Sequence, residues 1–254
     1  MKIFAVGHST FKLELNGQVI FTDPWFGTSG FVNRLFARRI FPVGVRAKSI
    51  ERCDLMLVSH GHIDHVCQEA FAVARRLNSL VIGPPGIILR ARRARVPHVH
   101  DLSPGGVIKR GDITITGVPA VHPLSRNALG YLLEGERSIY FSGDTRFDWG
   151  IVEFLKDRAI DVAILQVSCA FYPWLNGADG MDVNYAEELA KAIRPKYVIP
   201  MHFDCAGKYV DLIAGKRVTE YDLELENSLE RFRRRLLSHG IGCGILYSGQ
   251  TVNL

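Results

Sequence analysis

The chain of 254 residues is 47% hydrophobic and 22% charged, with five cysteines and a formal net charge of +5. These values exclude collagen-like, disordered and coiled-coil proteins, and the length allows a substantial core. No apolar stretch approaches the length of a membrane span, the first residues lack a signal-peptide pattern, and no cysteines form a CxxC pair. We therefore expect a cytoplasmic protein with reduced thiols.

The first half of the chain alternates β-like runs with helical patterns. Three opening strands are predicted at 2–6, 11–15 and 18–22, with Asn16-Gly17 as a two-residue hairpin turn. Further strands are predicted at 54–59, 81–83, 112–118, 131–134 and 138–142, and helices at 66–77 and 86–95.

The second half continues the alternation. Strands are predicted at 161–167 and 197–200, and helices at 149–156, from Asn184 onward and at 225–236. Asn184 followed by Glu187 predicts a capping-box start for the middle helix. No low-complexity linker separates the halves, so mixed strands with interleaved helices predict the α/β class and a single domain spanning 1–254.

Basic residues concentrate in two stretches, 90–95 and 231–235, which both fall in predicted helices. No aromatic platform for bases accompanies them, so we expect solvated helix faces and no nucleic-acid partner. An anionic partner or a subunit contact in a homo-oligomer is the alternative. The mixed basic and aromatic stretch 26–48 is open to three interpretations: a lid, a subunit interface or a membrane-surface patch.

The most informative segment contains His60, His62, Asp64 and His65, where the predicted strand 54–59 gives way to a helix. Three imidazoles and a carboxylate so close together are poor material for a core, because buried charge without partners is unfavourable. They suit a metal site, since imidazole nitrogen and carboxylate oxygen bind zinc, manganese or iron. A strand-to-helix turn can direct alternate residues toward two ions.

Three further candidates follow other predicted strands: His122, Asp144 and His202. Alone, each has an ordinary explanation, a hydrogen-bonded structural histidine or an aspartate in a turn. Together with the segment at 60–65, they supply the ligands that two coordination spheres need.

In this order, the seven residues resemble the binuclear motif of the metallo-β-lactamase superfamily. Segments 7–11, 22–24, 118–122 and 181–202 are similar to its lactonase-like metal-dependent hydrolase branch, which includes L-ascorbate-6-phosphate lactonase. The resemblance covers nearly the whole chain. It implies a four-layer αββα sandwich of two mixed sheets flanked by helices, with the metals at one edge of both sheets.

The resemblance also implies roles for these residues. His60, His62 and His122 would hold one divalent cation, Asp64, His65 and His202 a second, and Asp144 would bridge them. Zinc is expected, with manganese, iron or nickel as alternatives. A hydroxide shared by the ions, with Asp64 and Asp144 as catalytic carboxylates, would cleave a small-molecule ester or lactone.

Alternatives remain open at this point. One is a phosphodiesterase or phospholipase D-like hydrolase acting on a small or lipid phosphodiester, and another is a structural or sensory metal site without turnover. Antibiotic hydrolysis is disfavoured, because Asp144 stands where zinc β-lactamases place cysteine. The short interval from Asp144 to His202 leaves no room for the insertion of nucleic-acid-cleaving relatives.

Four other residues are candidates for substrate contact or for support of the ligands. His8 follows the first strand and could lie near the metals, and Asp23 could orient a ligating imidazole. Trp25 and Tyr172 lie in predicted loops, where they could line the mouth of a pocket. Backbone-bonded histidine, a plain turn and ordinary packing are the rival interpretations.

Overall fold

A computed structural model describes residues 1–27, 37–172, 177–206 and 223–254 of the chain. The centre of the predicted stretch 26–48 therefore lies outside the described residues. No helix in the described ranges is both long and apolar enough to cross a membrane.

The described residues form two seven-stranded mixed sheets. The first has the order β18-β1-β2-β3-β5-β6-β7 and contains β1 (Lys2–Gly7), β2 (Thr10–Leu15), β3 (Gln18–Thr22), β5 (Leu55–Leu57), β6 (Leu80–Gly83), β7 (His98–Asp101) and β18 (Thr251–Asn253). The second has the order β17-β15-β12-β11-β10-β9-β8 and contains β8 (Val107–Arg110), β9 (Ile113–Pro119), β10 (Leu129–Glu134), β11 (Ser138–Phe141), β12 (Val162–Gln166), β15 (Tyr197–Met201) and β17 (Gly242–Cys243). In each sheet one half is antiparallel and the other half is parallel.

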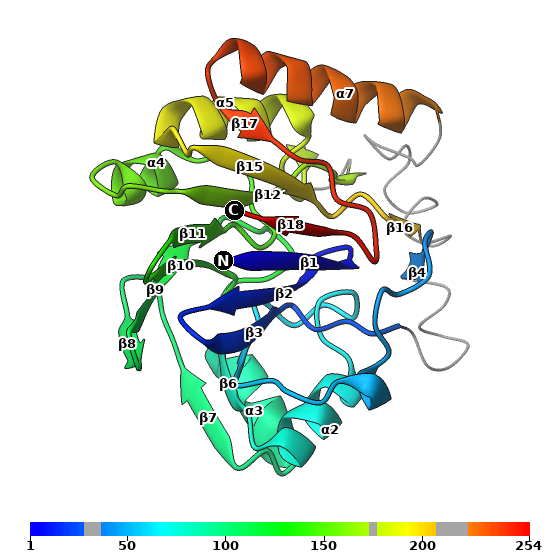
Figure 1. Cartoon of the computed structure of the whole chain (residues 1–254), viewed down its shortest axis with the longest axis vertical. Coiled ribbons are helices and arrows are strands. Elements are labelled where there is room, and N and C mark those ends of the chain that lie inside the picture. The colour runs from blue at the N-terminus through cyan, green and yellow to red at the C-terminus, as the bar shows by residue number, and fades with distance from the viewer. Residues whose placement is uncertain (28–36, 173–176, 207–222) are drawn as a thin grey trace.

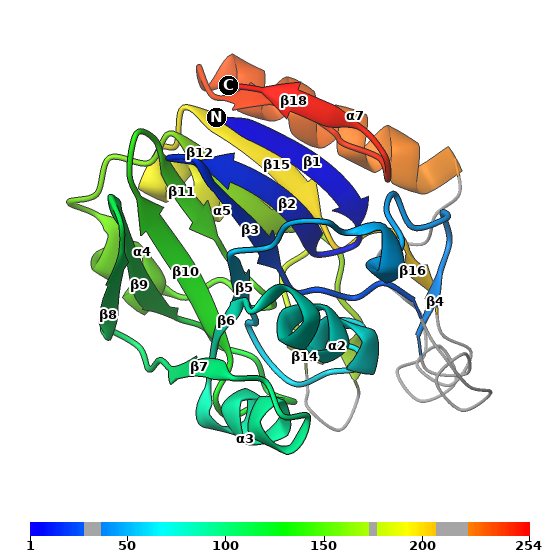
Figure 2. The same ribbon diagram turned by 60° about the horizontal axis from the view of Figure 1, so that its bottom comes forward.

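Helices cover the outer face of each sheet (Figures 1 and 2). The first sheet packs against α2 (Gln68–Leu77) and α3 (Pro85–Arg93). The second packs against α4 (Trp149–Leu155), α5 (Val183–Ile193) and α7 (Leu223–Ser238). This confirms the predicted sandwich of two mixed sheets flanked by helices.

The central core lies between the sheets, and the alternation along the strands explains why. In β5, Leu55 and Leu57 face the other sheet, whereas Met56 packs under the helices. In β12, Ile164 faces the central core and Ala163 faces the helices. Because successive side chains point to opposite faces, strands that are covered on both sides must be apolar throughout.

Several local predictions are confirmed. The strand predicted at 18–22 has these bounds in the structure, and Asn16 and Gly17 both have positive φ, as a tight hairpin turn requires.

The predicted capping box of α5 is wrong. Asp182 is the N-cap, and its carboxylate accepts from the Asn184 and Tyr185 amides, while Glu187 pairs with Arg235 instead.

Two short ribbons and a 3-10 helix, Ala47–Ser49, complete the described elements. The ribbons pair β4 (Arg38–Arg39) with β16 (Cys205–Ala206), and β13 (Phe171–Tyr172) with β14 (Gly177–Ala178).

Candidate metal centre

The candidate residues share one position in the fold: each follows the carboxyl end of a strand. His8 follows β1, Asp23 follows β3, the segment at 60–65 follows β5, and His122 follows β9. Asp144 comes after β11 and His202 directly after β15 in the same way. Within each sheet these strands run in one direction, so their carboxyl ends lie along a single edge.

Three imidazoles converge to form the first donor group, His60, His62 and His122. Nε2 of His60 lies 2.9 Å from Nδ1 of His62, and Nε2 of His122 lies 3.2 Å from the same atom. His60 and His122 are buried and His62 is partly buried. Three imidazole nitrogens that face one point make a donor set that suits a transition-metal ion.

The second donor group comprises His8, Asp64, His65 and His202, whose ligand atoms lie within 4.8 Å of one another. Asp144 lies between the two groups. Its Oδ2 is 3.2 Å from Nε2 of His65, 3.1 Å from Nε2 of His202, and 3.9 Å from Nε2 of His60. The structure therefore brings all seven predicted ligands together and adds His8.

Asp23 lies behind the two groups and is fully buried. Its Oδ2 accepts from Nδ1 of His65 and from the Ser59 hydroxyl, both at 2.7 Å, and its Oδ1 accepts from the Ser59 amide at 2.6 Å. Nδ1 of His60 lies 2.9 Å from the Ser59 hydroxyl. Because the oxygens of Asp23 already accept these bonds, Asp23 orients His65 directly and His60 through Ser59.

Five buried polar atoms of the centre's residues have no hydrogen-bond partner in the described chain: Nε2 of His8, Nε2 of His65, both ring nitrogens of His202, and Oδ1 of Asp144. Buried polar atoms are nearly always paired, because an unpaired one is unfavourable. Here they gather in one group of residues and are all metal-binding atom types. The residues present therefore fit divalent cations.

Burial shapes the charge state of the imidazoles. It lowers the pKa of His60 well below its ordinary value, with a further contribution from positive charge on His65, and lowers the pKa of His122 to about 4. Burial acts in the same direction on His65, but the carboxylates of Asp144 and Asp23 outweigh it and hold the His65 pKa well above its ordinary value. The first donor group thus contains neutral imidazoles with free lone pairs.

The two carboxylates at the centre respond in the opposite way. Burial tends to raise the pKa of Asp144, but the charges of His202 and His65 outweigh it and hold this pKa well below its ordinary value. For Asp64, burial is outweighed by the neighbouring imidazoles of His8, His65 and His202, so its pKa is also well below the usual range. Both side chains are ionised at neutral pH.

The remaining predicted residues lie in different surroundings. Trp25 is fully buried and packs edge-on against His8 at a centroid distance of 5.2 Å, so it lies against a residue of the second donor group and not at the surface. Tyr172 is buried in β13, which pairs with β14. β14 ends at Ala178, and the carbonyl of the next residue, Asp179, accepts from Nδ1 of His122.

Sequence reasoning missed three residues that support the centre: Ser59, Asp204 and Arg39. Asp204 is 3.1 Å from Nδ1 of His8 and pairs with Arg39 through its other oxygen. A usable signal was present, because Ser59 directly precedes the predicted ligands and Asp204 stands two residues after His202.

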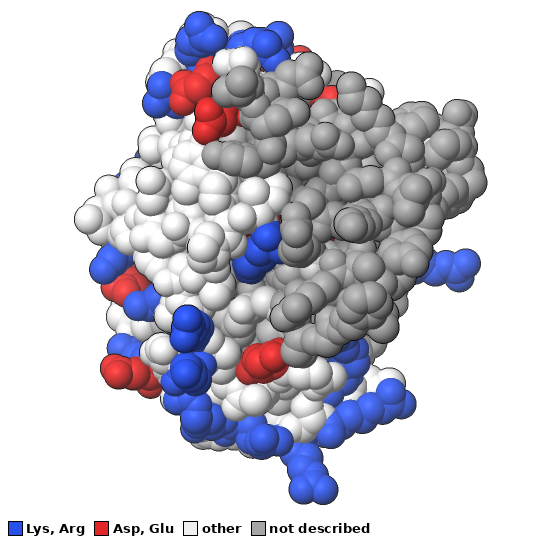
Figure 3. Space-filling model, turned by 90° about the vertical axis from the view of Figure 1, so that its right-hand side faces the viewer, with Lys and Arg blue, Asp and Glu red and all other residues white. Residues whose placement is uncertain are grey.

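The two basic stretches lie on the outer helices α3 and α7, and Figure 3 shows Lys and Arg side chains at both ends of one face. Arg92, Arg93 and Arg231 are exposed, as expected of solvated helix faces. Arg90 differs, because its guanidinium donates to the Gly61 carbonyl at 2.9 Å. It therefore helps to hold the turn that carries the imidazoles.

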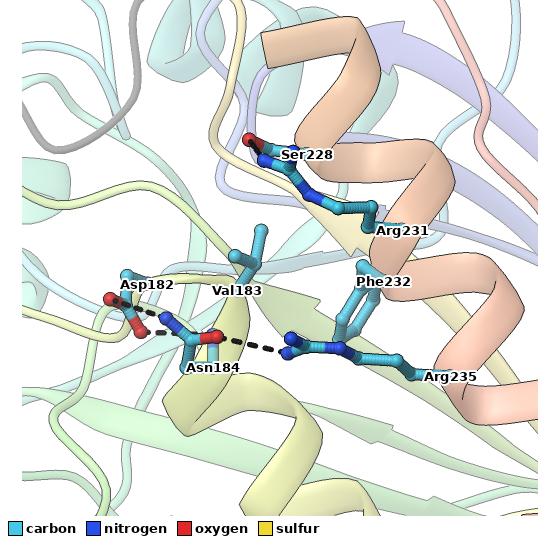
Figure 4. A pocket seen from close by; sticks show the side chains of 7 residues that line it. All are labelled: Asp182, Val183, Asn184, Ser228, Arg231, Phe232 and Arg235. Carbon is cyan, nitrogen blue, oxygen red and sulfur yellow. Dashed lines mark hydrogen bonds between the residues drawn. The ribbon is translucent and has the colours of Figure 1, made fainter. Parts of the chain in front are cut away.

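A pocket of about 320 Å³ lies between α5 and α7 (Figure 4). Arg235 on its wall donates to Asn184 and to Glu187, and the Asp182 carboxylate caps α5. None of its lining residues belongs to either donor group. This pocket is separate from the candidate metal centre.

The sequence of this chain is similar to those of several known proteins. The family described as Beta-lactamase superfamily domain matches residues 18–203. A UPF0173 protein of Pyrococcus furiosus is 29% identical, over 80% of this chain and 83% of its own length. A UPF0173 metal-dependent hydrolase of Roseobacter denitrificans is 28% identical, over 80% of this chain and 86% of its own length.

A similar fold occurs in the solved structure of Igni18, a metallo hydrolase of Ignicoccus hospitalis. The TM-score is 0.72 at 22% identity, covering 99% of this chain and 97% of that one. At this identity the likeness concerns the fold.

Proposed function

The chain belongs to the β-lactamase superfamily and is a metal-dependent hydrolase of it, and from this premise we propose that it uses two divalent cations to cleave a small-molecule ester or lactone. The observation that carries the proposal is the position of Asp144. Its Oδ2 lies 3.9 Å from the first donor group and 3.1 and 3.2 Å from imidazoles of the second. A carboxylate between two donor sets suits a bridging ligand.

In this proposal the first donor group holds one cation, and Asp64, His65 and His202 hold the other. Bound divalent cations act as Lewis acids and lower the pKa of water, which makes a nucleophile available near neutral pH. Zinc suits nitrogen and oxygen ligands, as do manganese, iron and nickel.

The chain's own residues prepare the centre in two ways. Neutral His60 and His122 present lone pairs without losing a proton, because burial keeps their pKa values low. Asp64 and Asp144, ionised at neutral pH, are the proposed catalytic residues. They offset part of the cationic charge and can accept a hydrogen bond that orients the attacking water.

The proposal treats residues 1–254 as one domain that acts in the cytoplasm on a small molecule, with a homo-oligomer as a further possibility. Support for one domain comes from the central core, which contains Ile3 near one end and Met201 far along the chain. β18, near the other end, pairs with β1.

The test is a panel of chromogenic lactone, ester and phosphodiester substrates, assayed on metal-free protein and after loading with zinc, manganese or nickel. We expect lactone or ester turnover that requires metal and returns on reloading. Turnover of phosphodiesters alone would identify the phosphodiesterase alternative. Inactivity across the panel at full metal occupancy would instead favour a structural or sensory metal site and contradict the proposal.

A further inference from the structure

His8 occupies an unusual position at the edge of the second donor group. It follows β1 with a φ of +57°, in the left-handed region that only a few per cent of non-glycine residues adopt, and its side chain is fully buried. Nδ1 lies 3.1 Å from Oδ1 of Asp204. Nε2 lies 3.5 Å from Oδ2 of Asp64 and has no hydrogen-bond partner in the described part of the protein. Strained backbone at such a position is typical of functional sites.

The hydrogen bonds of His8 repeat a pattern found in the predicted ligands. Nδ1 of His65 is held by a carboxylate oxygen of Asp23, and Nδ1 of His122 by the carbonyl of Asp179, both at 2.7 Å. In each case Nε2 points into a donor group. An acceptor on Nδ1 fixes the tautomer whose lone pair is on Nε2, and this arrangement is characteristic of metal-ligating histidine.

The acceptor behind His8 is itself held in place. Oδ2 of Asp204 lies 3.4 Å from Nη1 of Arg39, whose guanidinium sits 4.2 Å above the Trp25 ring and donates to the Trp25 carbonyl. A Cβ on Gly7 would come within 2.6 Å of Nη1 of Arg39 and 2.9 Å of Oδ2 of Asp204. Glycine before His8 therefore leaves room for the ion pair that orients the imidazole.

We propose that Nε2 of His8 is a fourth protein ligand of the second cation, beside Asp64, His65 and His202. The proposal rests on the proposed function, because it needs a cation at this group. Opposite ligands at bond lengths of about 2.0–2.2 Å lie roughly 4.4 Å apart, and the ligand atoms of these four residues all lie within 4.8 Å of one another. With Asp144 added, the second cation would have more protein ligands than the first. The first cation would then be the one with an open position for substrate.

The test compares metal binding in wild-type protein, H8A and H8Q, with H98A as the matched control because His98 is exposed in β7. Metal-free protein is titrated with Co²⁺, and stoichiometry, visible absorption and competition with a chromogenic chelator are recorded. We expect two Co²⁺ per chain in wild type and H98A. H8A and H8Q should bind the second Co²⁺ at least about tenfold more weakly, with an altered visible spectrum.

The glutamine variant separates a ligand from a hydrogen-bond donor. Its amide can donate to Asp64 but is a poor substitute for imidazole as a ligand. If His8 only positions Asp64, H8Q will match wild type in affinity and spectrum, and the proposal is overturned. If wild-type protein binds no Co²⁺, the proposed function is refuted. If wild type and H8A bind two ions equally well, only the proposed role of His8 as a ligand is refuted.

Wild-type protein gives a second readout that does not depend on how H8A folds. In long-range ¹H–¹⁵N spectra of histidine-labelled protein, loading with Zn²⁺ should shift Nε2 of His8 and leave the proton on Nδ1. A protonated Nε2 on His8 in the loaded protein contradicts the proposal.

Discussion

The two donor groups lie side by side but are supported differently. In the first, the outward nitrogens face uncharged oxygens: the Ser59 hydroxyl behind His60, and a backbone carbonyl behind His122. In the second, carboxylates stand behind two of the three imidazoles, Asp23 behind His65 and Asp204 behind His8. A carboxylate acceptor makes an imidazole more basic and a stronger ligand. In the proposed two-cation centre, the second group would therefore hold its cation more firmly, and the first would exchange ligands more readily.

The largest expected effect comes from the carboxylate that the two groups share. D144N should lower kcat/KM more than about 100-fold, which exceeds the usual effect of changing a residue that only hydrogen-bonds to a metal ligand. Removal of metal with a chelator should have an effect of the same size. Kinetics on the best substrate of the panel, with elemental analysis of each variant, measure it. D161N is the control, because Asp161 pairs with Lys196 away from the donor groups. Activity in D144N near the wild-type level would refute the bridging role.

D23N should weaken the binding of the second cation by about 10–100-fold and the binding of the first cation by less. Asp23 holds His65 directly but reaches His60 only through Ser59. Asparagine tolerates the φ of +34° at this position, so the variant should fold. Competition with a chromogenic chelator gives both dissociation constants. Equal weakening of the two cations would show that the groups do not differ as described.

The groups should also differ in their dependence on pH. Because the pKa of His65 is held well above its ordinary value, metal-free protein carries a proton there that the second cation must displace. Affinity at that group should rise by about tenfold per pH unit until His65 deprotonates. His122, with a pKa of about 4, is neutral throughout this range, so the first group should show little change.

Calorimetric titrations in buffers of different ionisation enthalpy count the protons released. The raised pKa of His65 also stabilises the metal-free fold below the ordinary pKa of 6.5, and this contribution is lost as pH rises through the folded-state value. Thermal melts of metal-free protein should show that loss, and metal-loaded protein should not. Proton release from the first group instead of the second would contradict the expected difference in pH dependence between the two groups.

The smallest effect is expected for S59A. It removes a neutral hydrogen bond to Nδ1 of His60, worth about 1 kcal/mol, so the first cation should bind roughly fivefold more weakly. The same chelator competition detects it. A loss as large as that of D23N would mean that Ser59 acts mainly by holding Asp23.

Much of the fold followed from local patterns. The apolar strands β5 and β12 and the hairpin at Asn16-Gly17 are set by alternation and by turn chemistry, which act within a few residues. The start of α5 was misplaced because Asp182 and Asn184 are both residue types that cap helices well. The ion pair between Glu187 and Arg235, which are far apart in the sequence, cannot be predicted from local patterns. The weakly patterned strand β18 was missed, since its pairing with β1 joins the two ends of the chain.

For the candidate site, the seven predicted ligands were readable because imidazoles and carboxylates at strand ends are poor core material and suit metals. The sequence by itself determined which donor types exist and that they follow strands. Only the tertiary structure decided which atoms meet: that Trp25 is buried against His8, that Asp204 turns the His8 imidazole, and that Asp144 lies between the groups. The physical reason is that hydrogen bonds between distant residues select tautomer and orientation, and these contacts exist only once the two sheets have packed.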